Sequence, residues 1–200
     1  MRGRLIAVIV AGFLIGAIAG DAMLALTENG SERAVATSGK ALIGGPFALV
    51  DPNGKTVTDQ DFRGRFMLVF FGFTHCPDIC PAELQVMSQS LDALGPKADT
   101  VVPIFVTLDP ERDTPEVVGA YVKNFGSRFI GLTGSPEAIA AAAKAYRIAY
   151  AKFQEDPASS DYSIDHSALV YLMGKDGEYV THFAYGTPTD QMTEELKRYL

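Results

Sequence analysis

The sequence has little positive charge. Its 200 residues include 17 Lys and Arg against 24 Asp and Glu, which gives a formal net charge of −7 at pH 7. No basic cluster runs through the part that follows the N-terminal segment, whereas a nucleic-acid partner needs a basic surface. We therefore exclude nucleic acid as a partner. Internal repeats and low-complexity segments are also absent from the sequence, and residues 41–200 are enough for one compact domain with a hydrophobic core.

Cysteine is scarce as well: the chain has two, Cys76 and Cys80, in a C-x-x-x-C spacing. The nearly continuous apolar run at residues 66–73 predicts a strand that is buried on both faces. Pro77 and Pro81 favour an extended conformation at the cysteine before each of them, so we expect a turn and then a helix with Pro81 at its first position. Both thiols should lie at this strand-to-helix junction, where the unpaired N–H groups of a helix N-terminus stabilise a thiolate.

The spacing of the two cysteines favours a metal site over a redox pair. Residues four apart on a helix have Cβ atoms roughly 5–6 Å apart, whereas a disulfide needs about 3.5–4.5 Å. A metal with bonds near 2.3 Å, the zinc–thiolate value taken as a stand-in for copper, holds two sulfurs about 4 Å apart and relaxes this demand. A turn that flexes enough to close a disulfide keeps the redox alternative open. Two inert buried cysteines are the weakest interpretation, because such residues do not need flanking prolines.

Strands and helices alternate along the rest of the chain. Apolar runs and turn residues predict strands at residues 47–50, 55–58, 101–108, 129–132, 147–153, 168–173 and 178–184. Periodicity and capping residues predict helices after the cysteines up to residue 94, at residues 115–124 and 136–146, and from residue 188 onward. The polar residues 154–163 predict a surface loop. This order predicts an α/β fold of the thioredoxin-like type, a mixed sheet flanked by helices.

The N-terminal segment predicts a membrane anchor. Residues 5–26 are predominantly apolar and long enough to cross roughly 30 Å of hydrocarbon. Arg2 and Arg4 before them would keep the N-terminus in the cytoplasm. Ala17 and Ala19, on either side of Ile18, would also fit the small-residue cleavage site of a signal peptide, so a removed leader remains the alternative. No Ser-rich and Arg-rich leader of the mitochondrial type is present.

We therefore expect three regions. Residues 1–26 are the membrane anchor or signal peptide, residues 27–40 are a polar linker, and residues 41–200 are the folded domain. In a bacterium this places a single-pass protein in the inner membrane, with the domain on the periplasmic side.

Three separated motifs resemble one known family. They are Phe71–Pro81, Thr107–Pro115 and Tyr162–Ser167, and together they are similar to the SCO/SenC family of copper-binding, thioredoxin-like assembly factors over residues 41–200. The resemblance implies that copper binds through two cysteines and one distal histidine. It further implies a role in building the binuclear copper centre of cytochrome c oxidase subunit II.

Carried onto this chain, the resemblance gives the metal ligands Cys76, Cys80 and His166. Two thiolates and an imidazole suit copper(I), and the same set can also hold copper(II). His75 is an occasional ligand at most, because neighbouring side chains usually point apart. We expect His182 to be a surface residue.

Nearby acidic residues receive secondary roles. We expect Asp165 to orient the histidine ligand and Asp78 to tune the loop electrostatically. Asp109 and Asp113 should cap a helix or fix their loop, because a carboxylate suits copper(I) poorly, with Arg112 as a partner for them.

Two functions from different classes follow. The first is a metallochaperone that passes copper to oxidase subunit II by ligand exchange, after receiving it from another copper chaperone. The second is an enzyme, a thiol-disulfide oxidoreductase that reduces the copper-ligand cysteines of that subunit and is itself reduced by a thiol reductant. Thioredoxin's C-x-x-C motif is one residue shorter, which disfavours the second function. If reduction is the main role, His166→Ala should be tolerated. Peroxidase activity is a weaker alternative, and a copper or redox sensor would share the same site.

Overall fold

The computed structural model describes residues 42–154 and 161–200, which belong to one compact unit, Ala41–Leu200. The expected membrane anchor and linker lie outside these residues. No helix within the described ranges is both long enough and apolar enough to cross a membrane.

A five-stranded mixed sheet forms the centre of the domain, in the strand order β5-β4-β3-β8-β9. The strands are β3 (Phe66–Gly72), β4 (Val101–Thr107), β5 (Ile130–Leu132), β8 (Leu169–Met173) and β9 (Tyr179–Ala184). β3, β4 and β5 are parallel, and β8 and β9 are antiparallel to their neighbours. Every residue of β3 and β4 is buried, as expected for central strands that are covered on both faces.

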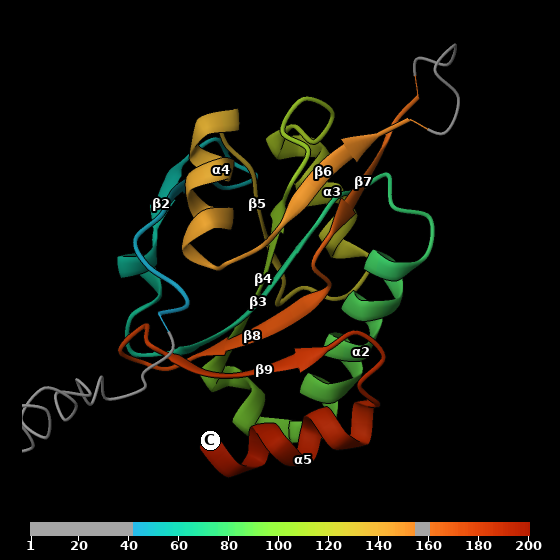
Figure 1. Ribbon diagram of the computed structural model, residues 1–200. Coiled ribbons are helices and arrows are strands. Elements are labelled where there is room, and N and C mark those ends of the chain that lie inside the picture. The colour runs from blue at the N-terminus through green and yellow to red at the C-terminus, as the bar shows by residue number, and fades with distance from the viewer. Residues whose placement is uncertain (1–41, 155–160) are drawn as a thin grey trace, which may run out of the picture. The chain divides into compact units, whose positions relative to one another are not determined.

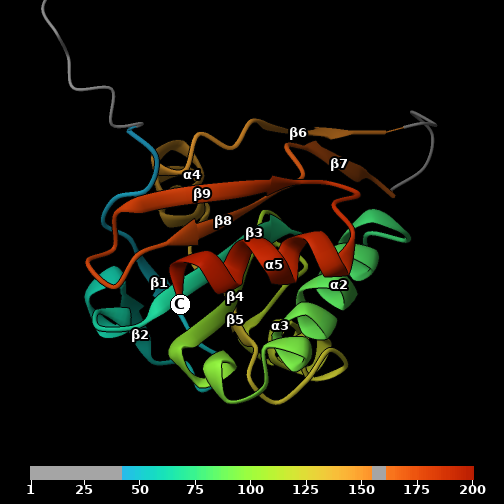
Figure 2. The same cartoon turned by 90° about the horizontal axis from the view of Figure 1, so that it is seen from below.

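Helices cover both faces of this sheet (Figures 1 and 2). They are α2 (Ile79–Leu94), α3 (Pro115–Lys123), α4 (Pro136–Ala145) and α5 (Thr189–Tyr199). Phe71 of β3 contacts Tyr146 at the end of α4, with ring centroids 5.2 Å apart. Side chains alternate between the two faces of a strand, so Phe105 of β4, which contacts Tyr121 of α3, lies on the opposite face with Phe70. The expected mixed sheet flanked by helices is confirmed.

Two small antiparallel pairs lie outside the central sheet. β1 (Ala48–Val50) pairs with β2 (Thr56–Thr58), and β6 (Tyr150–Phe153) pairs with β7 (Ser163–His166). We call the β6–β7 pair the ribbon; in Figure 1 it projects from the upper right of the sheet. Two short 3-10 helices, η1 (Asp59–Phe62) and η2 (Gly95–Thr100), precede β3 and β4.

Two strands differ by more than one residue from the sequence prediction. β7 begins at Ser163, inside the stretch expected to be a loop, because backbone pairing with β6 organises this polar segment where no apolar pattern signals a strand. β6 is also shorter than expected and begins only at Tyr150.

The helix that was expected to follow the cysteines begins at Ile79 and includes Cys80, so Pro81 is its third residue and not its first. Proline is tolerated there because the first four N–H groups of a helix have no partner inside the helix.

Candidate metal and thiol site

The two cysteines lie at the edge of the sheet where β3 and β4 end. Parallel strands bring their carboxyl ends together at one edge, where α/β proteins usually bind ligands. Cys80 is the second residue of α2 and is buried, whereas Cys76 lies in the preceding loop and is partly exposed. One sulfur is therefore accessible and the other is enclosed.

The pKa values of the two thiols are shifted in opposite directions. The Cys80 side chain donates a hydrogen bond to Cys76, and the Cys80 backbone N–H also points to the Cys76 sulfur at 3.4 Å. These donors lower the pKa of Cys76 to about 5, although burial opposes them. The pKa of Cys80 is raised, first by the hydrogen bond to Cys76 and then by burial. Cys76 is thus a thiolate at neutral pH, and Cys80 keeps its proton.

Gly72, the last residue of β3, makes room for the enclosed sulfur. A Cβ atom at this position would lie 2.7 Å from Cys80 Sγ and 3.0 Å from a ring carbon of Phe105. The absence of a side chain here allows α2 to bring Cys80 against the sheet edge.

His166 brings an imidazole to the same sulfur from 86 residues away in the chain. Its Nε2 lies 3.6 Å from Cys80 Sγ. Its Nδ1 lies 3.1 Å from the carbonyl oxygen of Ser167, so Nδ1 carries the proton and donates it. The Nε2 lone pair is therefore directed at Cys80. Phe70 and Phe73 both contact the imidazole edge-to-face, with centroid distances of 6.1 and 6.0 Å.

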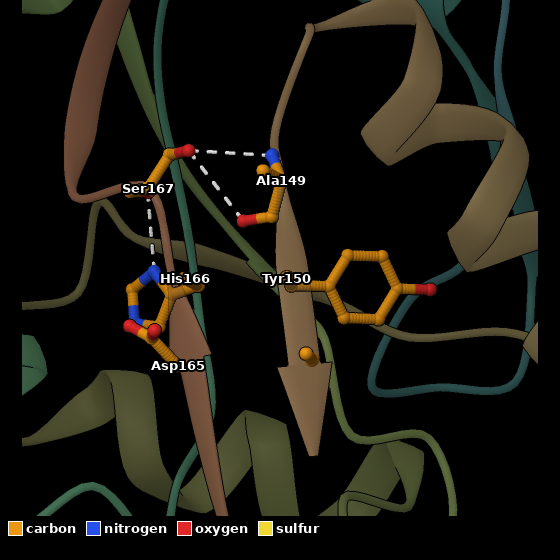
Figure 3. A pocket seen from close by; sticks show the side chains of 6 residues that line it. Ala149, Tyr150, Asp165, His166 and Ser167 are labelled. Atoms are coloured by element: carbon orange, nitrogen blue, oxygen red, sulfur yellow. Dashed lines mark hydrogen bonds between the residues drawn. The ribbon is translucent and has the colours of Figure 1, made fainter. Parts of the chain in front are cut away.

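Ser167 fixes the end of the ribbon, and Figure 3 shows its hydroxyl beside the N–H and the carbonyl of Ala149. Its backbone N–H donates to the carbonyl of Ala149 at 2.9 Å, and its hydroxyl accepts from the N–H of Ala149 at 3.2 Å. The open pocket at this point is also lined by Tyr150, Asp165 and His166. The carbonyl of Ser167 orients the imidazole, so the role that we expected for Asp165 falls to Ser167.

The other histidines lie apart from the sulfurs or have other partners. His75 Nδ1 lies 3.2 Å from the Thr74 hydroxyl and 3.8 Å from Asp113. His75 and the carboxylates of Asp113 and Asp109 have ligand atoms within 4.8 Å of one another. Both carboxylates already accept hydrogen bonds from neighbouring side chains, so this cluster is a hydrogen-bond network that fixes the loop. His182, on β9, is exposed and contacts the Tyr179 hydroxyl at 2.6 Å.

Sequence reasoning missed Gly72, Ser167 and Glu83. Gly72 and Ser167 both lie inside the motifs that carry the family resemblance, so their positions were visible while their contacts were not. Glu83 lies one helical turn after Cys80 and is 1% exposed. Its Oε1 has no hydrogen-bond partner among the described residues. Burial raises the pKa of Glu83 to about 7, against the opposing effect of the Gly186 N–H.

The buried carboxyl of Glu83 should make the folded protein less stable as pH rises. The folded-state pKa of about 7 lies above the reference value of 4.5, so Glu83 favours the fold below pH 4.5, and this contribution is lost as pH rises through 7. We expect Glu83→Gln to raise the free energy of unfolding by about 2 kcal/mol at pH 8 and to change it little near pH 4.5. Denaturant unfolding at both pH values measures this, with the exposed Glu194→Gln as control. Equal effects of Glu83→Gln at the two pH values would contradict it.

Comparison with known proteins supports one family. The family model described as SCO1/SenC matches residues 35–200. The chain is 43% identical over 168 residues to "Protein SCO1 homolog 1, mitochondrial" of Arabidopsis thaliana. The aligned stretch covers 82% of this chain and 50% of that protein. The chain thus spans about half the length of this relative.

Solved structures agree in fold and in sequence. Bradyrhizobium japonicum ScoI with copper bound superposes with a TM-score of 0.72 at 45% identity, covering 79% of this chain and 99% of that one. A second solved structure is that of BsSco, whose description names a disulfide switch and calls BsSco a member of the Sco family of cytochrome c oxidase assembly proteins. It superposes with a TM-score of 0.62 at 26% identity, covering 80% of this chain and 94% of that one. The family model, the sequence identity and the superposition all lead to one assignment: this chain belongs to the SCO1/SenC family.

Proposed function

We propose that the protein is a copper chaperone that holds one copper ion through Cys76, Cys80 and His166. The distance of 3.6 Å between Cys80 Sγ and His166 Nε2 carries this proposal. For a three-coordinate metal with bonds of about 2.3 Å to sulfur and 2.0 Å to nitrogen at 120°, these two atoms lie about 3.7 Å apart. The observed separation of these two atoms therefore supports a shared metal ion.

The chemistry of the three groups supports copper(I) as the ion. Thiolates are soft ligands, and imidazole is an acceptable third one. Cys76 is already a thiolate at neutral pH, because its pKa is about 5. Cys80 must lose its proton when the metal binds, so loading at neutral pH should release about one proton. The copper-bound ScoI of Bradyrhizobium japonicum is a relative consistent with this assignment.

Transfer by ligand exchange fits the exposure of the site. Cys76 is the accessible ligand and Cys80 the enclosed one, so an incoming thiolate can replace Cys76 while Cys80 and His166 still hold the ion. We propose the binuclear copper centre of cytochrome c oxidase subunit II as the acceptor and another copper chaperone as the donor. The description of BsSco as belonging to a family of oxidase assembly proteins supports this choice. Anchoring in a bacterial inner membrane with a periplasmic domain would keep the domain near its acceptor.

The oxidation state of the cysteines tests this function directly. Copper and a Cys76–Cys80 disulfide require the same sulfurs, so we expect the reduced full chain to retain one copper(I) per molecule and the oxidised chain to retain none. Metal analysis after gel filtration against a competing chelator measures both. Equal retention by the oxidised protein would contradict the ligand set.

The acidities of the two thiols favour one second candidate, a thiol-disulfide oxidoreductase. Cys76 as a thiolate would attack a disulfide of subunit II and form a mixed disulfide. Cys80, once deprotonated, would then attack Cys76, release the second thiol of the substrate and leave the protein oxidised. A thiol reductant would restore it. His166 Nε2 is close enough to accept the proton of Cys80, so His166→Ala should slow this reaction as well and does not separate the two functions, contrary to our expectation from the sequence.

Copper-free protein separates the two candidates. A reductase reduces a disulfide peptide from subunit II faster than a simple dithiol does, and Cys80→Ser accumulates the mixed disulfide. A chaperone without reductase activity shows neither effect, and once it is loaded with copper(I) it transfers the ion to the reduced peptide.

A further inference from the structure

One loop contacts both segments that carry the proposed copper ligands. It follows β4 and runs from Asp109 to Thr114, the residue that caps α3. Its first part faces the ribbon that carries His166, and its last part faces the loop that carries Cys76. The loop therefore connects the segment that carries the histidine with the segment that carries Cys76, in addition to the direct contact of His166 with Cys80.

On the cysteine side, the connection is Asp113. This side chain is fully buried and accepts hydrogen bonds from the backbone N–H and the hydroxyl of Thr74, two residues before Cys76. The hydroxyl of Thr107, near the end of β4, donates to the same carboxylate. The position of the cysteine loop is thus tied to the end of β4.

On the histidine side, the connection is Tyr162, which precedes β7. Its hydroxyl donates to Asp109 at 2.7 Å. The guanidinium of Arg112 lies 3.7 Å from the centroid of the Tyr162 ring and donates to the Tyr162 carbonyl at 3.1 Å. Arg112 is also paired with Asp109. The three side chains form a closed set of contacts four residues before His166.

The ribbon needs such support. Its strands pair with each other and not with the central sheet, and all four residues of β6 are exposed. A two-stranded pair alone is marginally stable in water. His166 is the last residue of β7, so a small rotation of the ribbon moves the imidazole of His166 away from Cys80.

We propose that Asp109, Arg112 and Tyr162 form a brace that holds His166 over the sulfurs and so sets how long copper is retained. These three are positioning residues, since none of them contacts the sulfurs or the imidazole among the contacts above. The proposal rests on the proposed function for its copper measurement, and its effect on the ribbon can be measured without copper.

Tyr162→Phe is the sharpest test, because it removes the hydroxyl bond to Asp109 and keeps the ring under Arg112. A hydrogen bond to a charged group has a net value that corresponds to roughly a tenfold change in an equilibrium. We expect copper(I) to leave the reduced Tyr162→Phe protein roughly tenfold faster than the wild type, and amides of β7 in the copper-free protein to exchange with solvent faster by a similar factor. Tyr199→Phe is the matched control: it removes a hydrogen bond of the same kind, from an exposed tyrosine hydroxyl to Glu195 on α5, and should change neither rate.

A double-mutant cycle separates positioning from general weakening. If the brace acts through His166, adding Tyr162→Phe to His166→Ala should not speed copper loss further. The proposal is overturned if Tyr162→Phe leaves copper loss unchanged, if Tyr199→Phe has the same effect, or if Tyr162→Phe speeds loss equally without His166. A wild-type protein that retains no copper refutes the proposed function instead, and amide exchange then decides whether the brace holds the ribbon.

Discussion

Replacing His166 with alanine is expected to lower the affinity of the reduced protein for copper(I) roughly 100-fold or more. The zinc–ligand scale gives the size: four ligands supply about 10–16 kcal/mol, or about 3 kcal/mol for each, which is more than a factor of 100. No other described histidine can replace it, because His182 lies on β9 beside Tyr179 and His75 is directed at Thr74 and Asp113. Competition with a chromogenic copper(I) chelator measures the affinity.

His182→Ala is the matched control for this experiment. It removes an imidazole of the same size from an exposed position and should leave copper affinity unchanged. Full affinity in the His166→Ala protein would remove His166 from the ligand set, and with it the three-coordinate site.

Gly72→Ala is expected to damage both the fold and the copper site. The added Cβ would meet Cys80 Sγ at 2.7 Å and Phe105 at 3.0 Å, so α2 or its cysteine must shift. Overpacking of this kind costs about 1–3 kcal/mol of stability. If the Cys80 sulfur moves by even half of the shift needed to relieve this close contact, it no longer matches the position of His166 Nε2. We therefore expect copper affinity to fall at least tenfold as well. Denaturant unfolding and the same chelator competition measure the two effects.

The cause of the Gly72→Ala effect can be isolated. In the Cys80→Ala background the sulfur is gone, so Gly72→Ala should cost much less stability there. Gly134→Ala is the matched control on an ordinary backbone, because its Cβ would meet Leu49 and Ala138 no closer than 3.4 Å. An equal loss of stability with and without the Cys80 sulfur would show that the contact with Cys80 is not the cause.

The sequence predicts the parts of the fold that local chemistry determines. β3 and β4 follow from continuous apolar runs, and α3 and α4 from Thr114 and Ser135, whose side chains cap them as expected at an N-terminus followed by proline. The junction that carries Cys76 was predictable because the apolar run of β3 ends just before the prolines of the cysteine motif.

The remainder depends on contacts between distant segments. β7 has a single apolar residue, Ile164, and it pairs with β6, whose four residues are all exposed, so periodicity gave no signal for β7. The contact between Tyr162 and Asp109 joins residues 53 positions apart, and nothing in either local sequence indicates it. The family resemblance placed His166 near the cysteines, but the orientation of its ring by Ser167 needed the structure. The membrane anchor remains a prediction, because it lies outside the described residues.

X-ray absorption at the copper edge tests the central claim most directly, because it counts the atoms around the ion. For the reduced, copper-loaded protein we predict two sulfurs at about 2.3 Å and one imidazole nitrogen at about 2.0 Å, and loss of the nitrogen alone in His166→Ala. Copper bound by sulfur only, with an identical spectrum in the variant, would contradict the convergence of two thiolates and one imidazole on a single ion.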